Sequence, residues 1–288
     1  MNTLDQKLHF AFTTNQQIIQ LIAEIDLFRG KWEHLEQLHP VFLQELKGLA
    51  TIQSIGSSTR IEGATLSDNE IEQLIADLKV NKLENRDEQE VIGYYDVLEL
   101  IFDNAENIHL TENYIMQLHT VLLRYSTKDS GQKGAYKKVS NKVVASYLDG
   151  TQRVIFNTTE PYLVQKEMQE LLSWTNKRLE NLEYHPLLVV GLFIYEFLSI
   201  HPFHDGNGRL SRLLTTLVLI KLDYDFIQYI SFEHIIENRK ERYYAALMEC
   251  QRKRNTEEER VDTWMLFFLH ALKMVTVKLS LKMSNSDG

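Results

Sequence analysis

The chain has 288 residues, of which 44% are hydrophobic and 25% charged, the proportions of an ordinary soluble globular protein. Its net charge of −9 provides no general attraction to nucleic acid or to an anionic membrane surface, so we expect neither as a partner. A single cysteine excludes an intramolecular disulfide and is typical of a reducing compartment. Because no signal-peptide pattern opens the sequence, we predict a cytoplasmic protein.

Helical periodicity dominates the first part of the chain. Apolar residues recur at spacings of three and four in residues 16–28 and 41–55, and Gly63 after the second run suits a helix end. The tetrapeptide SDNE at 67–70 has the form of a capping box and predicts a helix through Lys79. Two further helices are predicted, one that follows the charged run 84–90 and ends at Phe102, and one over 112–124 that Thr111 can cap.

The pattern changes to strand-like between residues 131 and 158. The segment KVVASYLDGTQRVIF places β-branched residues on both sides of Asp149-Gly150, a dipeptide typical of tight hairpin turns. A two-residue turn at this dipeptide would pair Ala145 with Val154. We therefore predict a β-hairpin in this part of the chain.

Helical patterns resume after the hairpin. The first follows TTEPY, with Thr159 as its predicted cap and Pro161 in its first turn. The predicted helices are 161–181, 186–200, 208–221, 239–252 and 261–282. No repeat and no linker rich in proline or glycine interrupts them, so the sequence predicts an all-α fold, a helical bundle with one projecting β-hairpin.

The segment HPFHDGNGRLSR, from His201 to Arg212, has the composition of a site for a charged ligand. Pro202 ends the preceding helix, which leaves His201 outside regular structure. The glycines around Asn207 allow successive N–H groups to converge into an anion-binding nest, and the next helix adds its free N-terminal N–H groups. Arg209 and Arg212 are three residues apart and lie on one helix face. The segment therefore predicts a polyphosphate site.

Two side chains of this segment indicate the chemistry. A carboxylate beside phosphates, here Asp205, predicts a hard cation, most simply Mg²⁺. His201 suits a general base that takes a proton from an attacking hydroxyl, because the pKa of histidine lies near neutrality. An isolated histidine at this place would be interpreted as a helix end, but the nest and the arginines favour catalysis. The predicted reaction is an in-line displacement at a nucleotide phosphorus.

The same segment resembles the signature of Fic-domain proteins, His-Pro-Phe-x-(Asp/Glu)-Gly-Asn-Gly-Arg-x-x-Arg, at every fixed position. The resemblance implies an all-helical, Fic-type bundle with a small β-hairpin flap. It places the Fic core at residues 105–254, after an N-terminal helical extension at 1–104 and before a C-terminal helix at 255–288. It also implies a nucleotidyltransferase that moves AMP from ATP to a hydroxyl of a target protein, with ATP as co-substrate and Mg²⁺ as cofactor.

The resemblance implies a role for each residue of the signature. His201 is the base, Asp205 holds Mg²⁺, and Phe203 packs inward to fix the loop. Arg209 contacts the β-phosphate and Arg212 the γ-phosphate. The implied nucleotide-binding residues, of which the glycines and the asparagine cradle the α- and β-phosphates, are Gly206, Asn207, Gly208, Arg209, Leu210, Ser211 and Arg212.

Two features outside the signature also resemble parts of Fic proteins. The hairpin at 139–157 resembles the flap on which a target segment docks by strand addition. Tyr243 and Tyr244 lie where family members place adenine contacts, although aromatic residues at helical spacing also commonly pack in a core. Self-modification and formation of a homodimer remain open.

An upstream segment, SSTRIEG at 57–63, resembles the inhibitory motif (Ser/Thr)-x-x-x-Glu-(Gly/Asn). Its matching residues are Ser58, Glu62 and Gly63. In proteins that carry this motif, the glutamate pairs with the second arginine of the signature, which is Arg212 here. The resemblance therefore implies autoinhibition within the chain, with the carboxylate of Glu62 competing against the γ-phosphate of ATP.

Three other functions remain open. The same site would serve to remove AMP from a target or to transfer another phosphate-containing group. A His-Asp pair such as His204-Asp205 also occurs in all-helical metal phosphohydrolases, which need further histidines and a distant aspartate. A nucleotide-sensing interaction module would bind ATP without catalysis. The other eight histidines, including His119, show no metal-ligand spacing, and we interpret them as structural.

Overall fold

The computed structural model describes residues 3–77, 83, 85–128, 131–146 and 151–286. Its helices are α1 (Phe12–Leu38), α2 (Pro40–Ile61), α3 (Asp68–Ala76), α4 (Arg86–Asn104), α5 (Glu112–Leu122), α6 (Pro161–Asn181), α7 (Pro186–Ile200), α8 (Asn207–Lys221), α9 (Phe232–Glu237), α10 (Lys240–Gln251) and α11 (Asp262–Ser286). Short 3₁₀ turns occur at Gln6–Leu8, Ala105–Asn107 and Asp225–Gln228, and the strands are β1 (Lys142–Ser146) and β2 (Gln152–Asn157). The predicted all-α fold with one small hairpin is confirmed.

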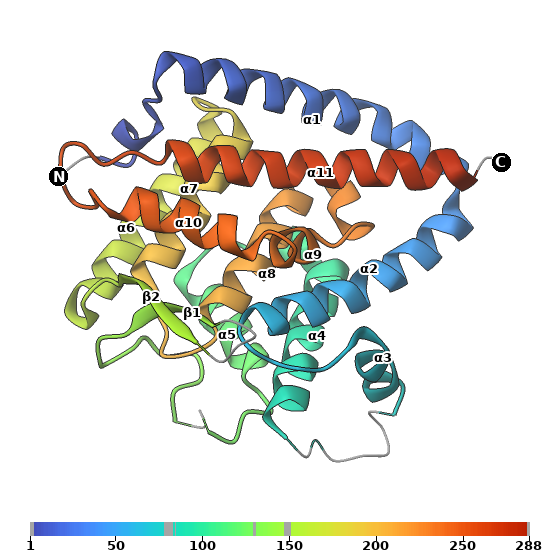
Figure 1. The fold of residues 1–288 in the computed structure, drawn as a ribbon, viewed down its shortest axis with the longest axis horizontal. Coiled ribbons are helices and arrows are strands. Elements are labelled where there is room, and N and C mark those ends of the chain that lie inside the picture. Colours follow the sequence, from blue (N-terminus) through green and yellow to red (C-terminus); the bar gives the residue numbers. More distant parts are fainter. Residues whose placement is uncertain (1–2, 78–82, 84, 129–130, 147–150, 287–288) are drawn as a thin grey trace.

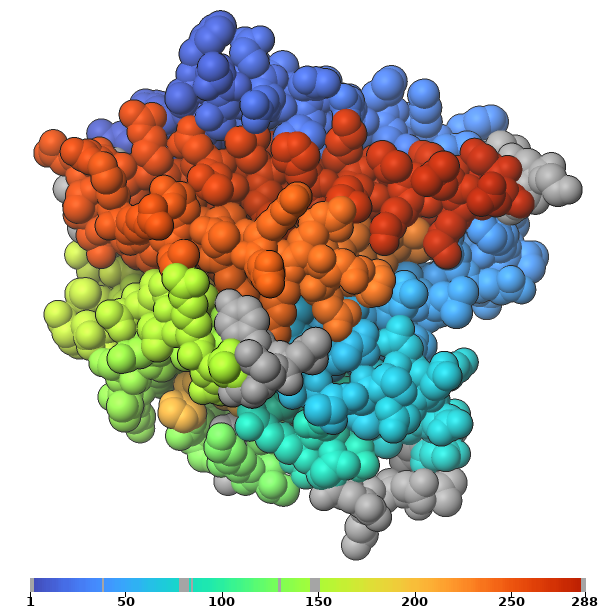
Figure 2. Space-filling view, in the orientation of Figure 1, coloured from blue at the N-terminus to red at the C-terminus, as the bar shows by residue number. Residues whose placement is uncertain are grey.

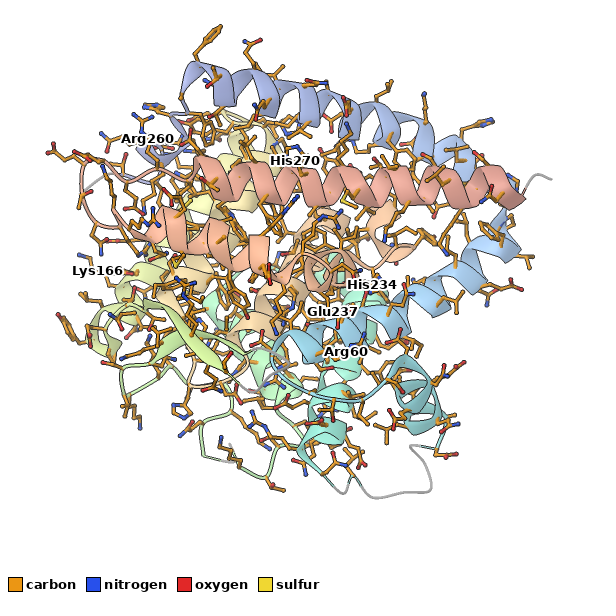
Figure 3. The ribbon with its side chains drawn as sticks, in the orientation of Figure 1. Arg60, Lys166, His234, Glu237, Arg260 and His270 are labelled. Carbon is orange, nitrogen blue, oxygen red and sulfur yellow. The ribbon has the colours of Figure 1, made fainter. Side chains whose placement is uncertain are left out.

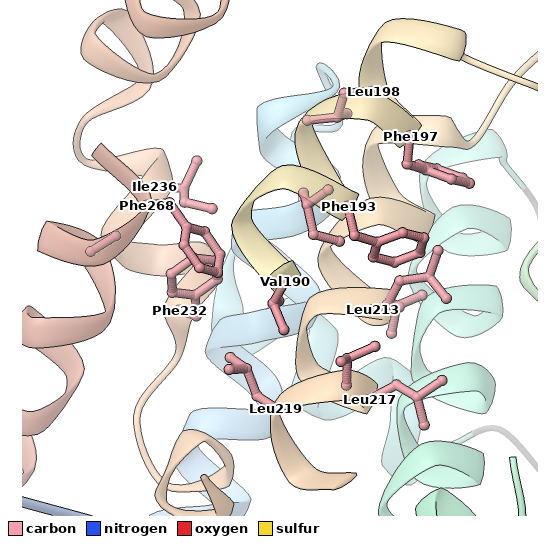
Figure 4. Packing of buried hydrophobic residues seen from close by; sticks show 14 of the residues in the cluster. Val190, Phe193, Phe197, Leu198, Leu213, Leu217, Leu219, Phe232, Ile236 and Phe268 are labelled. Carbon is pink, nitrogen blue, oxygen red and sulfur yellow. The ribbon is translucent and has the colours of Figure 1, made fainter. Parts of the chain in front are cut away.

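Helices α7 and α8 form the centre of the molecule. From Val189 to Ile200, every residue of α7 is buried, which is the property of a helix that neighbours cover on every side. Figure 4 shows Phe193 and Phe197 of α7 beside Leu213 and Leu217 of α8. Because α7 ends where the predicted polyphosphate segment begins and α8 starts inside it, both ends of that segment are anchored in the core.

The remaining helices surround this pair. Figure 1 shows α1 and α11 side by side along one edge of the molecule, with α10 next to α11. Helix α2 packs on α9 and α4, and its C-terminal end reaches the region where α8 begins. By length and composition α11 is apolar enough to cross a membrane, but half of its apolar window is buried inside the fold, as in a core helix.

Several predicted helix ends are confirmed by their caps. Ser67 and Glu70 form the predicted capping box of α3, although the helix ends at Ala76 and Lys79 lies outside the described residues. Thr111 caps α5 by accepting a hydrogen bond from the N–H of Tyr114.

One predicted cap is wrong. Glu160, and not Thr159, is the residue that precedes α6. The hydroxyl of Thr159 instead donates to Glu167, and its N–H donates to the carbonyl of Ser199 on α7. This residue therefore ties the start of α6 to α7, and Pro161 at the first helical position needs no N–H partner.

The predicted hairpin is present, but its register differs from the prediction. Strands β1 and β2 pair antiparallel, with Ala145 opposite Arg153 and not opposite Val154. The proposed turn residues 149–150 lie outside the described residues. The prediction took the register from an assumed two-residue turn, and the pairs Lys142–Asn157 and Val143–Phe156 have that register, whereas the pairs from Val144 to Ser146 are one residue away from it.

The pairing is irregular between Val143 and Val144. Two residues of β2 correspond to one of β1 there, as in a β-bulge, and Ile155 is the extra residue. As a result, the consecutive residues Ile155 and Phe156 are both buried, which regular alternation along a strand would prevent. The irregularity therefore accounts both for the shifted pairing of Ala145 and for the burial of two consecutive residues.

Candidate active site

The junction between α7 and α8 begins with a residue in an unusual backbone conformation. His201 follows the last turn of α7 with φ 52° and ψ 61°, the left-handed region that costs a non-glycine residue energy. Its Nδ1 lies 3.2 Å from the carbonyl oxygen of Leu198, so we assign the proton to Nδ1. The Nε2 atom is then an acceptor, and the half-buried imidazole lines a cavity.

The surroundings of His201 favour its neutral form. Burial lowers the pKa of His201 to about 4, against the opposing effects of the Leu198 carbonyl and of the carboxylates of Glu62 and Asp205. The imidazole is therefore unprotonated at neutral pH and able to accept a proton.

Asn207 and Phe203 fix the loop that follows. The side-chain oxygen of Asn207 accepts from the N–H of Phe203 at 2.9 Å, and its amide donates to the carbonyl of Phe203 at 2.8 Å. The ring of Phe203 is fully buried. The amide of Asn207 thus closes the loop on itself, and what this residue can offer a nucleotide is its backbone N–H.

His119 of α5 supports the same loop and was not predicted to do so. Its ring stacks on Phe203 with centroids 3.8 Å apart, and its Nε2 lies 3.0 Å from the carbonyl oxygen of Asp205. Its Nδ1 accepts from the N–H of Gly134 at 3.0 Å. Each partner is distant in sequence, so the spacing of the histidines contains no signal for this role.

Lys137 joins the hairpin to the same junction. Its buried ammonium group contacts Thr158 at 2.6 Å, Asn141 at 2.8 Å and the carbonyl of Ile200 at 3.1 Å, and burial lowers the pKa of Lys137 to about 8. Its own N–H donates to the carbonyl of Pro202 at 2.8 Å. The base of the hairpin is thereby fixed to the residues on either side of His201.

Asp205 and Arg209 form an ion-pair cluster with two residues of α4. Oδ1 of Asp205 accepts from the N–H of Gly206 at 2.7 Å and lies 3.4 Å from Arg209, while Oδ2 lies 3.2 Å from Arg86. Burial raises the pKa of Asp205, but the charges of Arg209 and Arg86 and the N–H of Gly206 together outweigh burial and hold the pKa below its usual value. The carboxylate is therefore ionised. Glu90 completes the cluster 3.3 Å from Arg209.

Arg209 retains hydrogen-bonding capacity inside this cluster. Its side chain is almost fully buried, and its Nε and Nη1 have no hydrogen-bond partner among the described residues. Buried guanidinium N–H groups without acceptors are costly, so an anionic ligand in this position would be stabilised.

Arg212 binds the end of α2. Its Nε donates to the hydroxyl of Ser58 at 2.7 Å, and its Nη2 donates to the Ser58 carbonyl at 2.9 Å and to Oε1 of Glu62 at 2.8 Å. Glu62 follows the last turn of α2, and Gly63 takes φ 109°, a conformation that suits glycine. Burial lowers the pKa of Arg212, but the charge and hydrogen bond of Glu62, together with the nearby Tyr243 and Tyr94, outweigh burial and raise the pKa above its usual value.

The carboxylate of Glu62 also covers the N-terminal end of α8. A Cβ atom at Gly208 would overlap Oε1 of Glu62, so a larger residue at this position would displace the carboxylate. The first turn of α8 carries unpaired N–H groups and the positive end of the helix dipole. An internal carboxylate therefore lies where an anion is electrostatically favoured.

A separate set of ion pairs holds the end of α2 in place. Arg60 donates to Glu237 of α9 at 2.7 Å and to Asp68 of α3 at 2.9 Å. Ser57 of the same turn lies 3.3 Å from Nδ1 of His234. Figure 3 shows Arg60 on α2 next to Glu237 and His234. The position of Glu62 thus depends on contacts outside the predicted site.

A cavity of about 180 Å³ lies between the α7–α8 junction and Glu62. Its walls are the α7–α8 junction, β1, Glu62 and two buried residues of α10, Tyr243 and Tyr244. The two tyrosine rings pack edge to face with centroids 5.1 Å apart. Of the predicted site residues, those that line the cavity are His201, Asp205, Gly206, Asn207, Gly208, Glu62, Tyr243 and Tyr244.

Residues 109–219 match the model of the Fic/DOC family. The chain contains a Fic/DOC family domain. It is 26% identical over 231 residues to protein adenylyltransferase Fic of Aedes aegypti, and 22% identical over 234 residues to protein adenylyltransferase fic-1 of Caenorhabditis elegans. These matches cover 74% and 79% of this chain but 42% of each relative, so the chain spans less than half the length of both.

Solved structures of Fic proteins share the fold. A Fic family protein from Desulfovibrio desulfuricans is 27% identical with a TM-score of 0.78, and the match covers 96% of this chain and 76% of that one. A Fic-domain signalling protein from Bacteroides thetaiotaomicron has a TM-score of 0.72 at 24% identity, over 91% and 97% of the two chains. The predicted family and the predicted Fic-type fold are confirmed.

The low pKa of His201 is testable in the free protein. NMR titration of the imidazole signals, with His201→Ala to assign the missing one, should give a midpoint near 4, because burial disfavours the imidazolium. The ring then stays neutral as the pH falls below 6.5 and gains its proton only near 4. A midpoint close to 6.5 would contradict the described environment.

Proposed function

We propose that this protein transfers AMP from ATP to a hydroxyl side chain of a target protein. The observation that carries the proposal is the placement of His201, whose imidazole, with Nε2 assigned as an acceptor, lines the same cavity as the glycine turn and the start of α8. The names of two relatives, both protein adenylyltransferases, support the same activity. The target protein is not specified by these features.

In the proposed reaction, the hydroxyl oxygen of the target attacks the α-phosphorus of ATP while Nε2 of His201 accepts the hydroxyl proton. A new bond forms between oxygen and phosphorus, the bond to the β-phosphate oxygen breaks, and pyrophosphate leaves with the electron pair. The N–H groups at the start of α8 and the N–H of Nε of Arg209, which has no hydrogen-bond partner among the described residues, stabilise the charge on the phosphates. Tyr243 and Tyr244, which line the same cavity, are the proposed adenine contacts.

Asp205 suits the proposed Mg²⁺ cofactor. Its ionised carboxylate lines the cavity, and its side chain is 31% exposed. In the part of the chain that the structure describes, no group of three or more His, Cys, Asp or Glu side chains is placed to hold a metal. A single carboxylate completed by phosphate oxygens and water is a usual environment for Mg²⁺, which would neutralise phosphate charge when bound.

We also propose that Glu62 inhibits the reaction. Its carboxylate pairs with Arg212 and lies against Gly208, so it competes with the negative phosphates of ATP for the same cation and the same helix end. The contact is internal to the chain, and inhibition would therefore act in cis.

The hairpin is the proposed docking site for the target. Lys142, Val143 and Val144 of β1 line the cavity, so a segment added along β1 would pass close to His201. A two-stranded sheet leaves a strand edge open, and pairing with an extended segment requires backbone groups more than particular side chains.

Mass spectrometry after incubation with ATP and Mg²⁺ tests the activity and the inhibition together. Glu62→Gly should increase AMP incorporation by at least about tenfold over the wild type, since it removes one charge-assisted hydrogen bond of roughly 1.5–3 kcal/mol. Adding His201→Ala to Glu62→Gly should abolish the gain in mass.

Other outcomes would support other functions. Tight ATP binding without incorporation, even in Glu62→Gly, would identify a nucleotide-sensing module. Loss of AMP from a target that was modified beforehand would identify the reverse activity. Hydrolysis of phosphoesters without protein labelling would favour a phosphohydrolase.

The anchoring role of Arg60 gives a second prediction. Arg60→Ala removes the ion pairs to Glu237 and Asp68, so the end of α2 should become mobile and AMP incorporation should rise, though less than in Glu62→Gly. Arg252→Ala is the control, because it removes only an exposed pair with Glu249. Incorporation at the wild-type level in a folded Arg60→Ala protein would show that the anchor does not hold Glu62.

A further inference from the structure

A groove of about 920 Å³ runs between α10 and α11 and plays no part in the proposed reaction. Leu266, Phe267 and Met274 of α11 line one wall, and Ala245 and Ala246 of α10 line the other. The two helices lie side by side in Figure 1, and both reach the face shown in Figure 2. The groove is thus an apolar depression at the surface.

The outer face of α11 has the spacing of a coiled-coil seam. Its residues, separated by intervals of four and three, are Thr263, Phe267, His270, Met274, Val277 and Leu281. Val277 and Leu281 are 46% and 60% exposed, and Figure 3 marks His270 on this helix. The opposite face, which includes Phe268 and Leu272, is buried in the core. Helix α11 therefore has a second apolar face that the fold itself does not cover.

The rim of the groove is positively charged, although the chain as a whole carries a net charge of −9. Arg239 and Arg242 lie on the α10 side, Lys273 and Lys278 on the α11 side, and Glu249 is the acid in this lining. Lys273 pairs with Glu24 of α1. Arg239, Arg242 and Lys278 form no ion pair with a carboxylate among the described residues.

We propose that this groove binds an amphipathic helix of another protein, with apolar residues at heptad spacing and acidic residues on both flanks. A helix has the width and straight course to fill a groove between two helices, and the seam from Phe267 to Leu281 offers it a length of roughly 21 Å. Lys273 and Lys278 occupy the flanking positions of the heptad that select partners by charge.

Two other occupants fit the groove less well. A second copy of this chain that docked face to face would oppose the cationic rim of one copy to that of the other. A membrane surface is planar and would leave the floor of a groove unfilled. A helix with acidic flanks satisfies both the apolar floor and the charged rim.

The test uses the full-length protein and a fluorescent probe peptide about three heptads long, with leucine at the two seam positions and glutamate at the two flanking positions. A second peptide carries lysine at the flanks. Fluorescence anisotropy should give at least about tenfold tighter binding of the glutamate peptide, with an affinity that falls as salt is raised. Val277→Asp should weaken this binding by at least about tenfold.

Two variants distinguish binding in the groove from non-specific binding of the peptide to apolar surface. The double variant Arg242→Glu with Lys278→Glu should reverse the preference toward the lysine peptide. Leu27→Asp, which introduces the same charge at a residue of α1 that is 62% exposed, should leave binding unchanged. Thermal melting monitored by circular dichroism establishes that each variant is folded.

Failure of both peptides to bind, or equal binding that the double variant does not alter, would overturn the proposal. So would a dimer of the free protein that Val277→Asp dissociates, which would assign the face to a second copy. Binding to phosphatidylserine vesicles that is lost in Val277→Asp, without peptide binding, would assign it to a membrane. These outcomes are independent of the AMP-transfer experiment.

Discussion

The ion pair between Glu62 and Arg212 is the contact on which the proposed function depends. It connects the end of α2 to the first turns of α8, and it places a carboxylate where the helix dipole and a buried guanidinium both favour negative charge. The position favours an anion, and the carboxylate of Glu62 occupies it. Because removing one partner of a buried pair leaves the other charge unpaired, Arg212 would need a replacement anion when Glu62 leaves. The phosphates of ATP have the charge to supply it.

The rigidity of the α7–α8 junction explains how so short a segment keeps its geometry. Both helices are central to the core, and the loop between them is closed by the side chain of Asn207 on the backbone of Phe203. His119 supports the loop from α5, and Lys137 ties it to the base of the hairpin. Groups held in this way would lose little entropy if a nucleotide bound as proposed.

The sequence predicted the parts of this site that lie close together along the chain. Proline after histidine, the paired glycines and the arginines at helical spacing each act within a few residues, so their physical consequences can be read locally. The supports from His119 and Lys137 could not be predicted, because they arise from contacts between distant segments. The predicted pairing of Ala145 was wrong because an irregularity between Val143 and Val144 shifts the register, and the sequence pattern did not indicate it. Locality was not a sufficient guide, because the local prediction of Thr159 as a cap was wrong, whereas the contact between Glu62 and Arg212 was predicted through the resemblance to Fic proteins.

Helix α10 lines both the cavity beside His201 and the groove against α11. Tyr243 on one side lines the proposed nucleotide cavity, and the centroid of its ring lies 5.7 Å from that of Phe267, which lines the groove on the other side. A partner helix in the groove would thus lie one layer of side chains from the proposed adenine pocket.

Calorimetric titration with ATP and with AMP tests the central claim most directly, with wild-type protein compared against Glu62→Gly. If Glu62 and the terminal phosphate compete for Arg212, the substitution should tighten ATP binding by at least about tenfold and change AMP binding far less, because AMP lacks that phosphate. Equal gains for both nucleotides, or no gain for ATP, would contradict the competition on which the account rests.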